Sequence, residues 1–139
     1  MEIQAYQWVD EHAVVALWLS CELVRPWNDP HKDIARKMQN QPDLFLVGKV
    51  QGQIMASAMF GYEGHRGWLN YLAVAPAHRR RGYARDLMRH GEAKLAAMGC
   101  PKINLQVRSS NARVIDFYQS LGYVDDQVIS LGKRLIVDH

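Results

Sequence analysis

The stretch VAPAHRRRGYARDLMRH, residues 74–90, places three arginines between the end of an apolar segment and the start of an amphipathic one. Residues 68–74 (WLNYLAV) are typical of a strand, and the segment from Gly82 repeats apolar side chains at helical spacing. The first N–H groups of a helix have no partners within it and lie at the positive end of its dipole. Because Gly82 lets the backbone approach an anion closely, the stretch predicts a phosphate or pyrophosphate site.

The run Arg79, Arg80 and Arg81 leaves two other interpretations open. Basic runs often line a solvated surface, and a basic patch can bind the backbone of a nucleic acid. However, no aromatic residues alternate with the arginines as stacking platforms, and the net charge of +3 is mild. The glycine motifs of dinucleotide-binding and P-loop proteins do not occur in the sequence. A compact anion therefore suits the run better than a long polyanion.

Working outward from this stretch, the pattern of apolar residues predicts helices and strands along the whole chain. We expect helices at 11–23 and 30–40, which Asp10 and Asp29 would cap. Three antiparallel strands (44–50, 54–62 and 68–74), a helix (82–98), a strand (102–110) and a last helix (111–121) follow. One or two strands within 123–137 end the chain. This order predicts an α+β (mixed α/β) fold.

The length of 139 residues fits one domain, residues 1–139, with a core of useful size. The composition, 48% apolar and 22% charged, is that of an ordinary globular protein. The sequence has no apolar run that could span a bilayer and no signal-peptide pattern at its start, so we expect a cytoplasmic protein. Cys21 and Cys100 indicate neither a disulfide framework nor a zinc site, and the six histidines lack metal-binding spacing.

A second segment, SNARVIDFYQSLGY, supports the phosphate-site interpretation. It places Asn111 and Tyr118 seven residues apart, so both lie on one face of a helix, two turns from each other. Taken alone, Asn111 is an N-cap and Tyr118 an aromatic side chain that packs the helix on a sheet. Both segments together suggest a shared site.

Because it contains both segments in this order, the chain resembles the GNAT-superfamily N-acetyltransferases over nearly its whole length. Their cofactor motif has the pattern R/Q-x-x-G-x-G/A, in which x is any residue. Here it runs from Arg79 to Ala84 and follows LAVAPAH. Their later motif runs here from Asn111 to Tyr123, with Val114 where the family has a small residue. The segments RPWNDP and SLGKRL resemble more closely the bacterial YpeA-type acetyltransferases.

The resemblance implies a GNAT-like fold, with a central, mostly antiparallel sheet, a splayed strand pair and flanking helices. It also implies acetyl-CoA as the acyl donor, whose pantetheine arm would pair with the backbone of Leu72, Ala73 and Val74. The pyrophosphate would bind to a loop made of Arg79, Arg80, Arg81, Gly82, Tyr83, Ala84 and Arg85. Asn111 would meet the end of the pantetheine, and Tyr118 would lie near the sulfur.

Acetyl transfer needs an oxyanion site and a proton for the departing thiolate. The backbone N–H of Val74 would supply the first, and Tyr118 would supply the second. A base is harder to find, because Gln106 stands where related N-terminal acetyltransferases have a glutamate. Glu63 or His65 would have to act through water. A site without a strong base favours amines of low pKa, hence an α-amine or a small-molecule amine.

Other expectations concern the acceptor and the partners. Trp18 and Trp27 are core aromatics or walls of a groove, and loop 25–30 is a candidate cover for the acceptor site. The expected partner is a small-molecule or peptide amine, with no nucleic acid and no membrane, and the protein is a monomer or a homodimer. Two alternatives stay open: a non-catalytic acyl-CoA-binding module, which Gln106 makes conceivable, and a basic nucleic-acid-binding domain.

Overall fold

The computed structural model describes residues 1–138, and its centre is one five-stranded sheet in the order β1-β2-β3-β4-β5. Neighbouring strands are antiparallel except β4 and β5, which are parallel. The strands are β1 (Glu2–Ala5), β2 (Phe45–Val50), β3 (Gln53–Tyr62), β4 (Gly67–Val74) and β5 (Ile103–Asn104). The predicted α+β fold with a mostly antiparallel sheet is confirmed.

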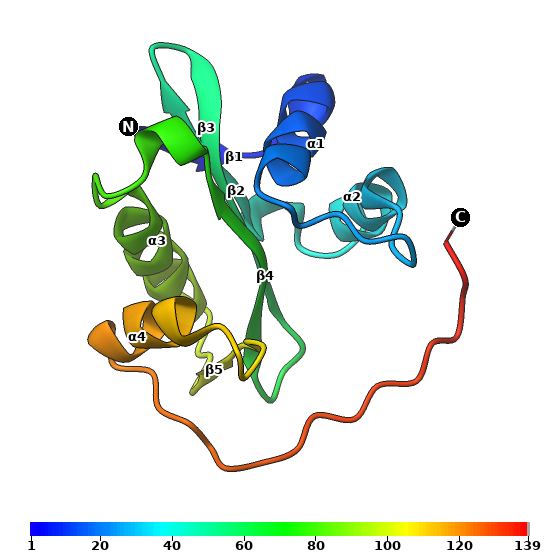
Figure 1. Ribbon diagram of the computed structural model, residues 1–139, viewed down its shortest axis with the longest axis vertical. Helices are drawn as coiled ribbons and strands as arrows, with labels where there is room; N and C mark the ends of the chain where they lie inside the picture. The colour runs from blue at the N-terminus through cyan, green and yellow to red at the C-terminus, as the bar shows by residue number, and fades with distance from the viewer. Residues whose placement is uncertain (139) are drawn as a thin grey trace.

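Helices cover both faces of the sheet (Figure 1). One face carries α1 (Glu11–Ser20) and α2 (Pro30–Met38), and the other carries α3 (Tyr83–Ala97) and α4 (Ala112–Ser120). Three short 3-10 turns join these elements: η1 (Trp8–Asp10), η2 (Pro42–Leu44) and η3 (Pro76–His78). None of the described helices has both the length and the apolar character needed to cross a membrane. Because helices cover both faces of the sheet, the protein has two apolar cores, with Trp18 and Phe45 buried in one and Phe60 and Leu87 in the other.

The two aspartates that were predicted to cap helices make different contacts in the structure. Asp29 caps α2 as expected, since its carboxylate accepts from the backbone N–H of His31 (2.9 Å) and Lys32 (3.2 Å). Asp10 occupies the N-cap position of α1 as expected, but its carboxylate makes no capping hydrogen bond to that helix, which η1 precedes directly. Its carboxylate instead accepts from the N–H of Gln7 (3.0 Å) and lies 3.6 Å from Lys49 Nζ.

A glycine sets the distance between α3 and the sheet. Gly91 lies in α3, and a Cβ built there would meet the ring of Phe60 of β3 at 2.1 Å. Phe60 is fully buried, so its ring has no room to retreat. The absent side chain therefore allows the close packing of α3 on β3.

Replacing Gly91 by alanine is expected to lower the free energy of unfolding by about 1–3 kcal/mol, because the methyl group overpacks the core. This loss runs against helix propensity, which favours alanine over glycine by about 1 kcal/mol. Urea unfolding of the Gly91→Ala variant measures the difference. A variant as stable as the wild type, or more stable, would show that the contact with Phe60 is not a constraint.

The ends of the chain depart most from the expected elements. The strand β1 was not predicted, and the predicted strand 102–110 is reduced to β5. The prediction of strands in 123–137 is wrong, because no described residue after α4 belongs to a strand. Residues 123–138 instead form an extended tail, which passes from the α4 side of the sheet to the α2 side (Figure 1). There Arg36 forms a two-pronged ion pair with Asp138, with both N–O distances 2.8 Å.

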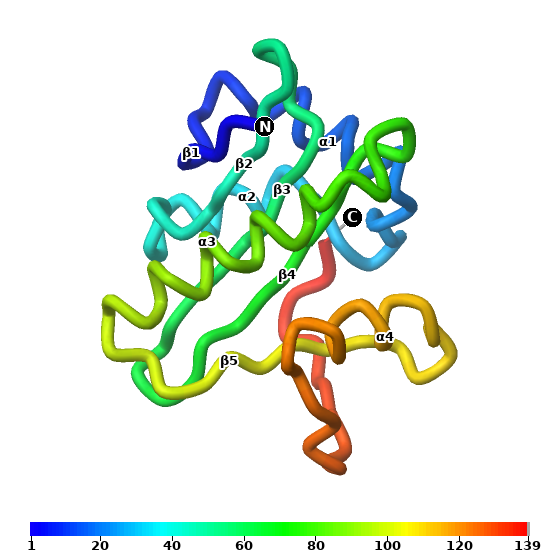
Figure 2. The backbone as a smooth tube through the Cα atoms, turned by 90° about the vertical axis from the view of Figure 1, so that its left-hand side faces the viewer, coloured from blue at the N-terminus to red at the C-terminus, as the bar shows by residue number. Residues whose placement is uncertain are grey.

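The pairing of β4 with β5 is short. It consists of Gly67 with Ile103 and Trp68 with Asn104, although β4 continues to Val74. Beyond these pairs the two segments separate, and the chain after β5 leads to α4 (Figure 2). The resulting gap is the splayed strand pair that the family resemblance implies.

Candidate functional site

A bulge in β4 shapes the strand just before the basic loop. Ser57 of β3 pairs with Ala73 and Met59 pairs with Asn70, so Tyr71 and Leu72 together face a single β3 residue. Tyr71 has a φ of 55°, in the left-handed region that side chains other than glycine rarely adopt. Bulges increase the local twist and redirect the strand. This one lies where β4 turns away from β5.

Contacts on the α1 and α2 face hold Tyr71 in this conformation. Its ring stacks on Trp18 with centroids 3.8 Å apart, and its hydroxyl donates to Asp33 Oδ2 at 2.7 Å. The backbone carbonyl of Tyr71 accepts from Ser57 Oγ (2.9 Å), which in turn accepts from Trp18 Nε1 (2.9 Å). Burial, reinforced by Asp33, raises the pKa of Tyr71, so its phenol stays protonated. Trp18 is fully buried and is therefore a core residue.

The open edge of β4 presents backbone groups of Val74. The N–H of Ala75 donates to Met55 O of β3 at 2.8 Å. Since successive residues of a strand direct their N–H and C=O groups to opposite edges, those of Ala73 also face β3 and those of Val74 face away from it. The Val74 carbonyl accepts from Arg79 Nε (3.2 Å) and from Cys21 Sγ (3.4 Å). The N–H of Val74 lies on the same open edge.

The basic loop leads directly into α3 and has an unusual backbone. Arg80 (φ 65°) and Gly82 (φ 80°) are both left-handed, and such alternation produces concave arrangements of N–H groups that bind anions. Among the described residues, no hydrogen bond is made by the backbone N–H groups of 80–85. A Cβ built on Gly82 would meet nothing within 4 Å, so the space beside it is open. This loop has the geometry of an anion site at the start of a fifteen-residue helix.

Side chains of the loop are tied to neighbouring parts of the chain. Arg79 bonds back to Val74, Arg81 Nη1 lies 3.4 Å from His78 Nδ1, and Arg85 Nη2 donates to Ser120 Oγ of α4 at 3.1 Å. The ring of Tyr83 faces that of His78 at an interplanar angle of 25°, with centroids 6.2 Å apart. The arginines add positive charge around the free N–H groups of Ala84 and its neighbours. A diphosphate fits both the charge and the donors.

The second motif lies on α4. Asn111 caps this helix, because its Oδ1 accepts from the N–H of Val114 at 3.4 Å. Tyr118, two turns later, is 8% exposed and packs in the same apolar cluster as Leu72 and Val74. Burial raises the pKa of Tyr118 to about 12. The fold therefore brings a protonated phenol to the side of the sheet on which β4 and β5 diverge.

The two candidate bases do not lie at this site. Glu63 and His65 belong to the turn between β3 and β4, at the opposite end of β4 from Val74. Eight strand residues put about 20 Å between them, too far for one bridging water. The Glu63 carboxylate also accepts from the backbone N–H groups of Arg66 and His65, which lower its pKa. The proposal that either residue acts as base through water is therefore wrong.

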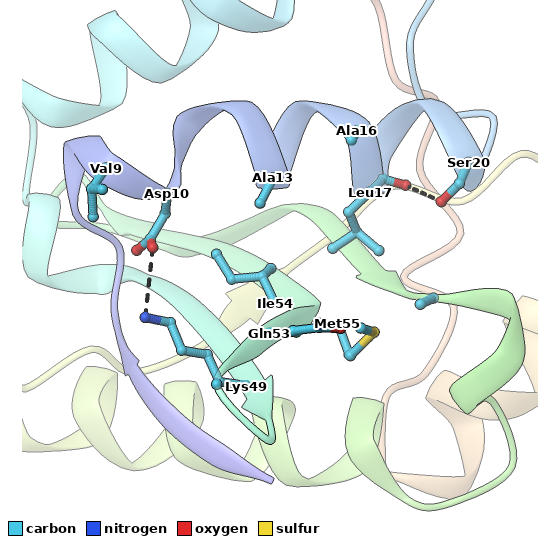
Figure 3. A pocket seen from close by; sticks show the side chains of 12 residues that line it. Val9, Asp10, Ala13, Ala16, Leu17, Ser20, Lys49, Gln53, Ile54 and Met55 are labelled. Atoms are coloured by element: carbon cyan, nitrogen blue, oxygen red, sulfur yellow. Dashed lines mark hydrogen bonds and ion pairs between the residues drawn. The ribbon is translucent and has the colours of Figure 1, made fainter.

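Two cavities lie on opposite sides of the sheet. A groove of about 950 Å³ runs beside β5, and its lining includes Gln106, Tyr118 and the start of the tail. A second cavity of about 530 Å³ lies between α1 and the β2–β3 hairpin (Figure 3). Its lining holds the Asp10–Lys49 ion pair and none of the predicted site residues. Trp27, in loop 25–30, is 46% exposed and lines neither cavity.

Some site features had no signal in the sequence. Tyr71 lies in an apolar segment with the pattern of a regular strand, so neither the bulge at Tyr71 nor its hydrogen bond to Asp33 was predicted. The bond from Cys21 to the Val74 carbonyl joins residues that are far apart in the chain. The predicted residues of the basic loop and of α4, in contrast, flank one end of β4.

Comparisons with known proteins agree with this geometry. The model of the acetyltransferase (GNAT) family matches residues 12–123. A Yersinia pestis protein named acetyltransferase is 51% identical over 138 residues, 99% of this chain and 98% of that protein. A putative acetyltransferase from Agrobacterium tumefaciens superposes with a TM-score of 0.81 at 18% identity, over 96% of this chain and 100% of the other. The Escherichia coli ribosomal-protein-S18-alanine N-acetyltransferase gives 0.70 at 27% identity, over 87% and 76%. The chain therefore belongs to the GNAT family and is an N-acetyltransferase.

Proposed function

We propose that this enzyme transfers the acetyl group of acetyl-CoA directly to a primary amine of low pKa, either an α-amine or the amine of a small molecule. One observation carries the proposal: the N–H of Val74 lies on the open edge of β4, and the same strand leads into the anion site at the start of α3. A donor molecule with a diphosphate at one end and a thioester at the other spans such an arrangement. GNAT acetyltransferases use acetyl-CoA.

Each part of the proposed donor site has a distinct task. The loop from Arg79 to Arg85 holds the diphosphate with its N–H groups and guanidinium charges. Leu72 offers its backbone groups and Val74 its carbonyl to the pantetheine amides, whereas the backbone groups of Ala73 between them are directed to β3. Asn111, at the start of α4, contacts the end of the pantetheine arm. Acetyl-CoA supplies the activated thioester, and the residues of the chain position it.

The chemical step needs two donors at the thioester. The N–H of Val74 stabilises the oxyanion that forms when the amine nitrogen attacks the carbonyl carbon. As the C–S bond breaks, Tyr118 gives its proton to the sulfur and takes one from the attached amine. The products are the N-acetylated amine and CoA with a free thiol, and no phenolate accumulates. A pKa of about 12 suits this role, since the phenol is protonated at every physiological pH.

The class of acceptor follows from the lack of a strong base among the residues considered for that role. Gln106 cannot accept a proton as a carboxylate does, and its amide donates to Ser130 Oγ. An α-amine with a pKa near 8 is substantially neutral at pH 7, whereas a lysine amine with a pKa near 10.4 is neutral roughly a hundredfold less often. The similar Escherichia coli enzyme, by its name, acetylates an alanine of a ribosomal protein. This likeness supports an α-amine.

A panel of acceptors tests the proposed specificity. CoA release is measured with peptides that carry a free α-amine, with the same peptides blocked at the N-terminus but containing lysine, and with small amines of graded pKa. We expect kcat/KM for free α-amines or small amines to exceed that for lysine peptides by roughly a hundredfold at pH 7, and the ratio to shrink as the pH rises. Turnover of lysine peptides without turnover of α-amines would contradict the proposed acceptor.

A further inference from the structure

A buried serine contacts the backbone of β4 at its bulge. Ser57 lies on β3 and pairs with Ala73, and both Ser57 and the neighbouring Trp18 are fully buried. The Ser57 hydroxyl accepts from Trp18 Nε1 at 2.9 Å and donates to the carbonyl oxygen of Tyr71 at 2.9 Å. A hydroxyl inside a core lowers stability unless it is hydrogen-bonded, and this one uses both its proton and a lone pair. The bulge is therefore held by a polar contact inside the core.

The direction of these two hydrogen bonds is fixed by the groups that form them. An indole N–H can only donate, so Trp18 occupies a lone pair of Ser57 Oγ and leaves the hydroxyl proton for another acceptor. That acceptor is the backbone carbonyl of Tyr71, which can only accept. Trp18 therefore orients the Ser57 hydroxyl, and the hydroxyl in turn orients the Tyr71 carbonyl.

The orientation of the Tyr71 carbonyl also fixes the N–H of Leu72. Both groups belong to one planar trans peptide, in which the C=O and the N–H point in opposite directions. Because the carbonyl points to Ser57, the N–H of Leu72 points away from Ser57. The alternation along the strand places this N–H on the open edge of β4, together with the N–H of Val74.

The backbone at the bulge is strained, so its conformation depends on such contacts. Tyr71 has a φ of 55°, and the left-handed region costs a residue with a side chain roughly 1–2 kcal/mol. The stacking on Trp18 and the hydrogen bond to Asp33 hold the side chain of Tyr71. The hydrogen bond from Ser57 holds its carbonyl, and it is this bond that acts on the next peptide.

We propose that Ser57 is a positioning residue for acetyl transfer: through the Tyr71 carbonyl it directs the N–H of Leu72 at the pantetheine arm and thioester of acetyl-CoA. This inference rests on the proposed function. Ser57 is fully buried, so it acts only through the backbone of β4. The N–H groups of residues 80–85 lie in a separate loop, where the diphosphate binds independently of Ser57. Loss of the Ser57 hydroxyl should therefore affect one end of the donor and spare the other.

The binding of two ligands separates this role from a general loss of structure. Titration calorimetry compares CoA, which has the diphosphate and the pantetheine arm, with ADP, which has the diphosphate alone. In Ser57→Ala the dissociation constant of CoA should rise roughly fivefold to tenfold, the effect of about one hydrogen bond, and that of ADP should stay unchanged. An unchanged affinity for CoA, or an equal loss for both ligands, would overturn the proposal. Neither ligand is turned over, so this result is independent of acetyl transfer.

A double-mutant cycle tests whether Trp18 acts through Ser57. In Ser57→Ala, kcat for CoA release should fall roughly tenfold to a hundredfold, because the thioester is held less well in place. Trp18→Phe keeps an aromatic ring but loses the indole N–H, and it should lower kcat less. In the Ser57→Ala background, Trp18→Phe should have no further effect on kcat, because the hydroxyl that it orients is already absent. Effects that multiply would overturn the action of Trp18 through Ser57.

Gln41→Met is the matched control. Gln41 Oε1 accepts from the N–H of Tyr62 (2.8 Å) and its Nε2 donates to the Tyr62 carbonyl (2.9 Å), at the end of β3. This variant also loses hydrogen bonds to a strand, so urea unfolding should show lower stability, whereas kcat and the affinity for CoA stay at wild-type values. Equal kcat in the wild type and Ser57→Ala would overturn the positioning role. A wild type without turnover would overturn the proposed function, and the CoA and ADP affinities would still decide the role of Ser57.

Discussion

Replacing Tyr118 by phenylalanine is expected to lower kcat for CoA release by roughly 10²–10⁴-fold, while the dissociation constant of acetyl-CoA stays unchanged. The phenylalanine ring keeps the packing of α4 but has no proton to give to the departing sulfur. Stopped assays with a thiol reagent measure kcat, and titration calorimetry measures binding. A variant with wild-type kcat would show that the sulfur obtains its proton elsewhere.

The matched control is Tyr123→Phe. Tyr123 packs against Tyr118 with ring centroids 5.8 Å apart, and its hydroxyl donates to Glu92 Oε2 at 2.7 Å. Losing this bond should cost about 1 kcal/mol of stability and leave kcat unchanged.

The pH profile adds a second test of Tyr118. Burial raises the pKa of Tyr118 above its ordinary value of 10.0, to about 12, so the protonated, active form persists below that pH. We therefore expect the rate of the wild-type enzyme to show no decline between pH 9 and the onset of that titration. A rate that falls near pH 10 would indicate an unburied phenol or a different proton donor.

The second large effect is expected at Gly82. A methyl group there occupies the open space next to the free N–H groups of the basic loop, so Gly82→Ala should raise KM for acetyl-CoA by at least about tenfold with little change in kcat. The left-handed backbone of an alanine costs about 1–2 kcal/mol of stability in addition. Initial rates at varied acetyl-CoA and urea unfolding measure the two effects separately.

Gly52 offers a close control for this substitution. It lies in the β2–β3 turn, its φ of 78° is nearly that of Gly82, and a Cβ built there also meets nothing within 4 Å. Gly52→Ala should therefore lose a similar amount of stability and keep the wild-type KM. Equal KM values for both variants would contradict an anion site at Gly82.

The sequence predicted the local geometry of the candidate site where that geometry rests on local rules. The basic loop and the α4 motif depend on helix starts, on glycine and on spacing within one helix, and Asn111 and Asp29 cap helices as their positions suggest. The β2–β3 hairpin also follows from a short turn between two apolar segments. Such features need no knowledge of distant residues.

Features that depend on pairing between distant segments were missed or wrong. The bulge at Tyr71 arises from the register between β3 and β4, and no turn residue marks it in the sequence. Residues 123–137 have the composition of strands, but a strand also needs a neighbour, which one chain does not provide in this structure. Glu63 and His65 precede β4 in sequence, yet the length of that strand separates them from Val74.

The most direct test of the central claim is to measure CoA and acetylated acceptor together, in one reaction of the wild-type enzyme with acetyl-CoA and an α-amino peptide. Direct transfer predicts equal molar amounts of CoA and acetylated peptide by mass spectrometry, and no CoA release when the peptide is omitted. Binding of acetyl-CoA without product from any amine in the panel would contradict this account and identify the chain as an acyl-CoA-binding module.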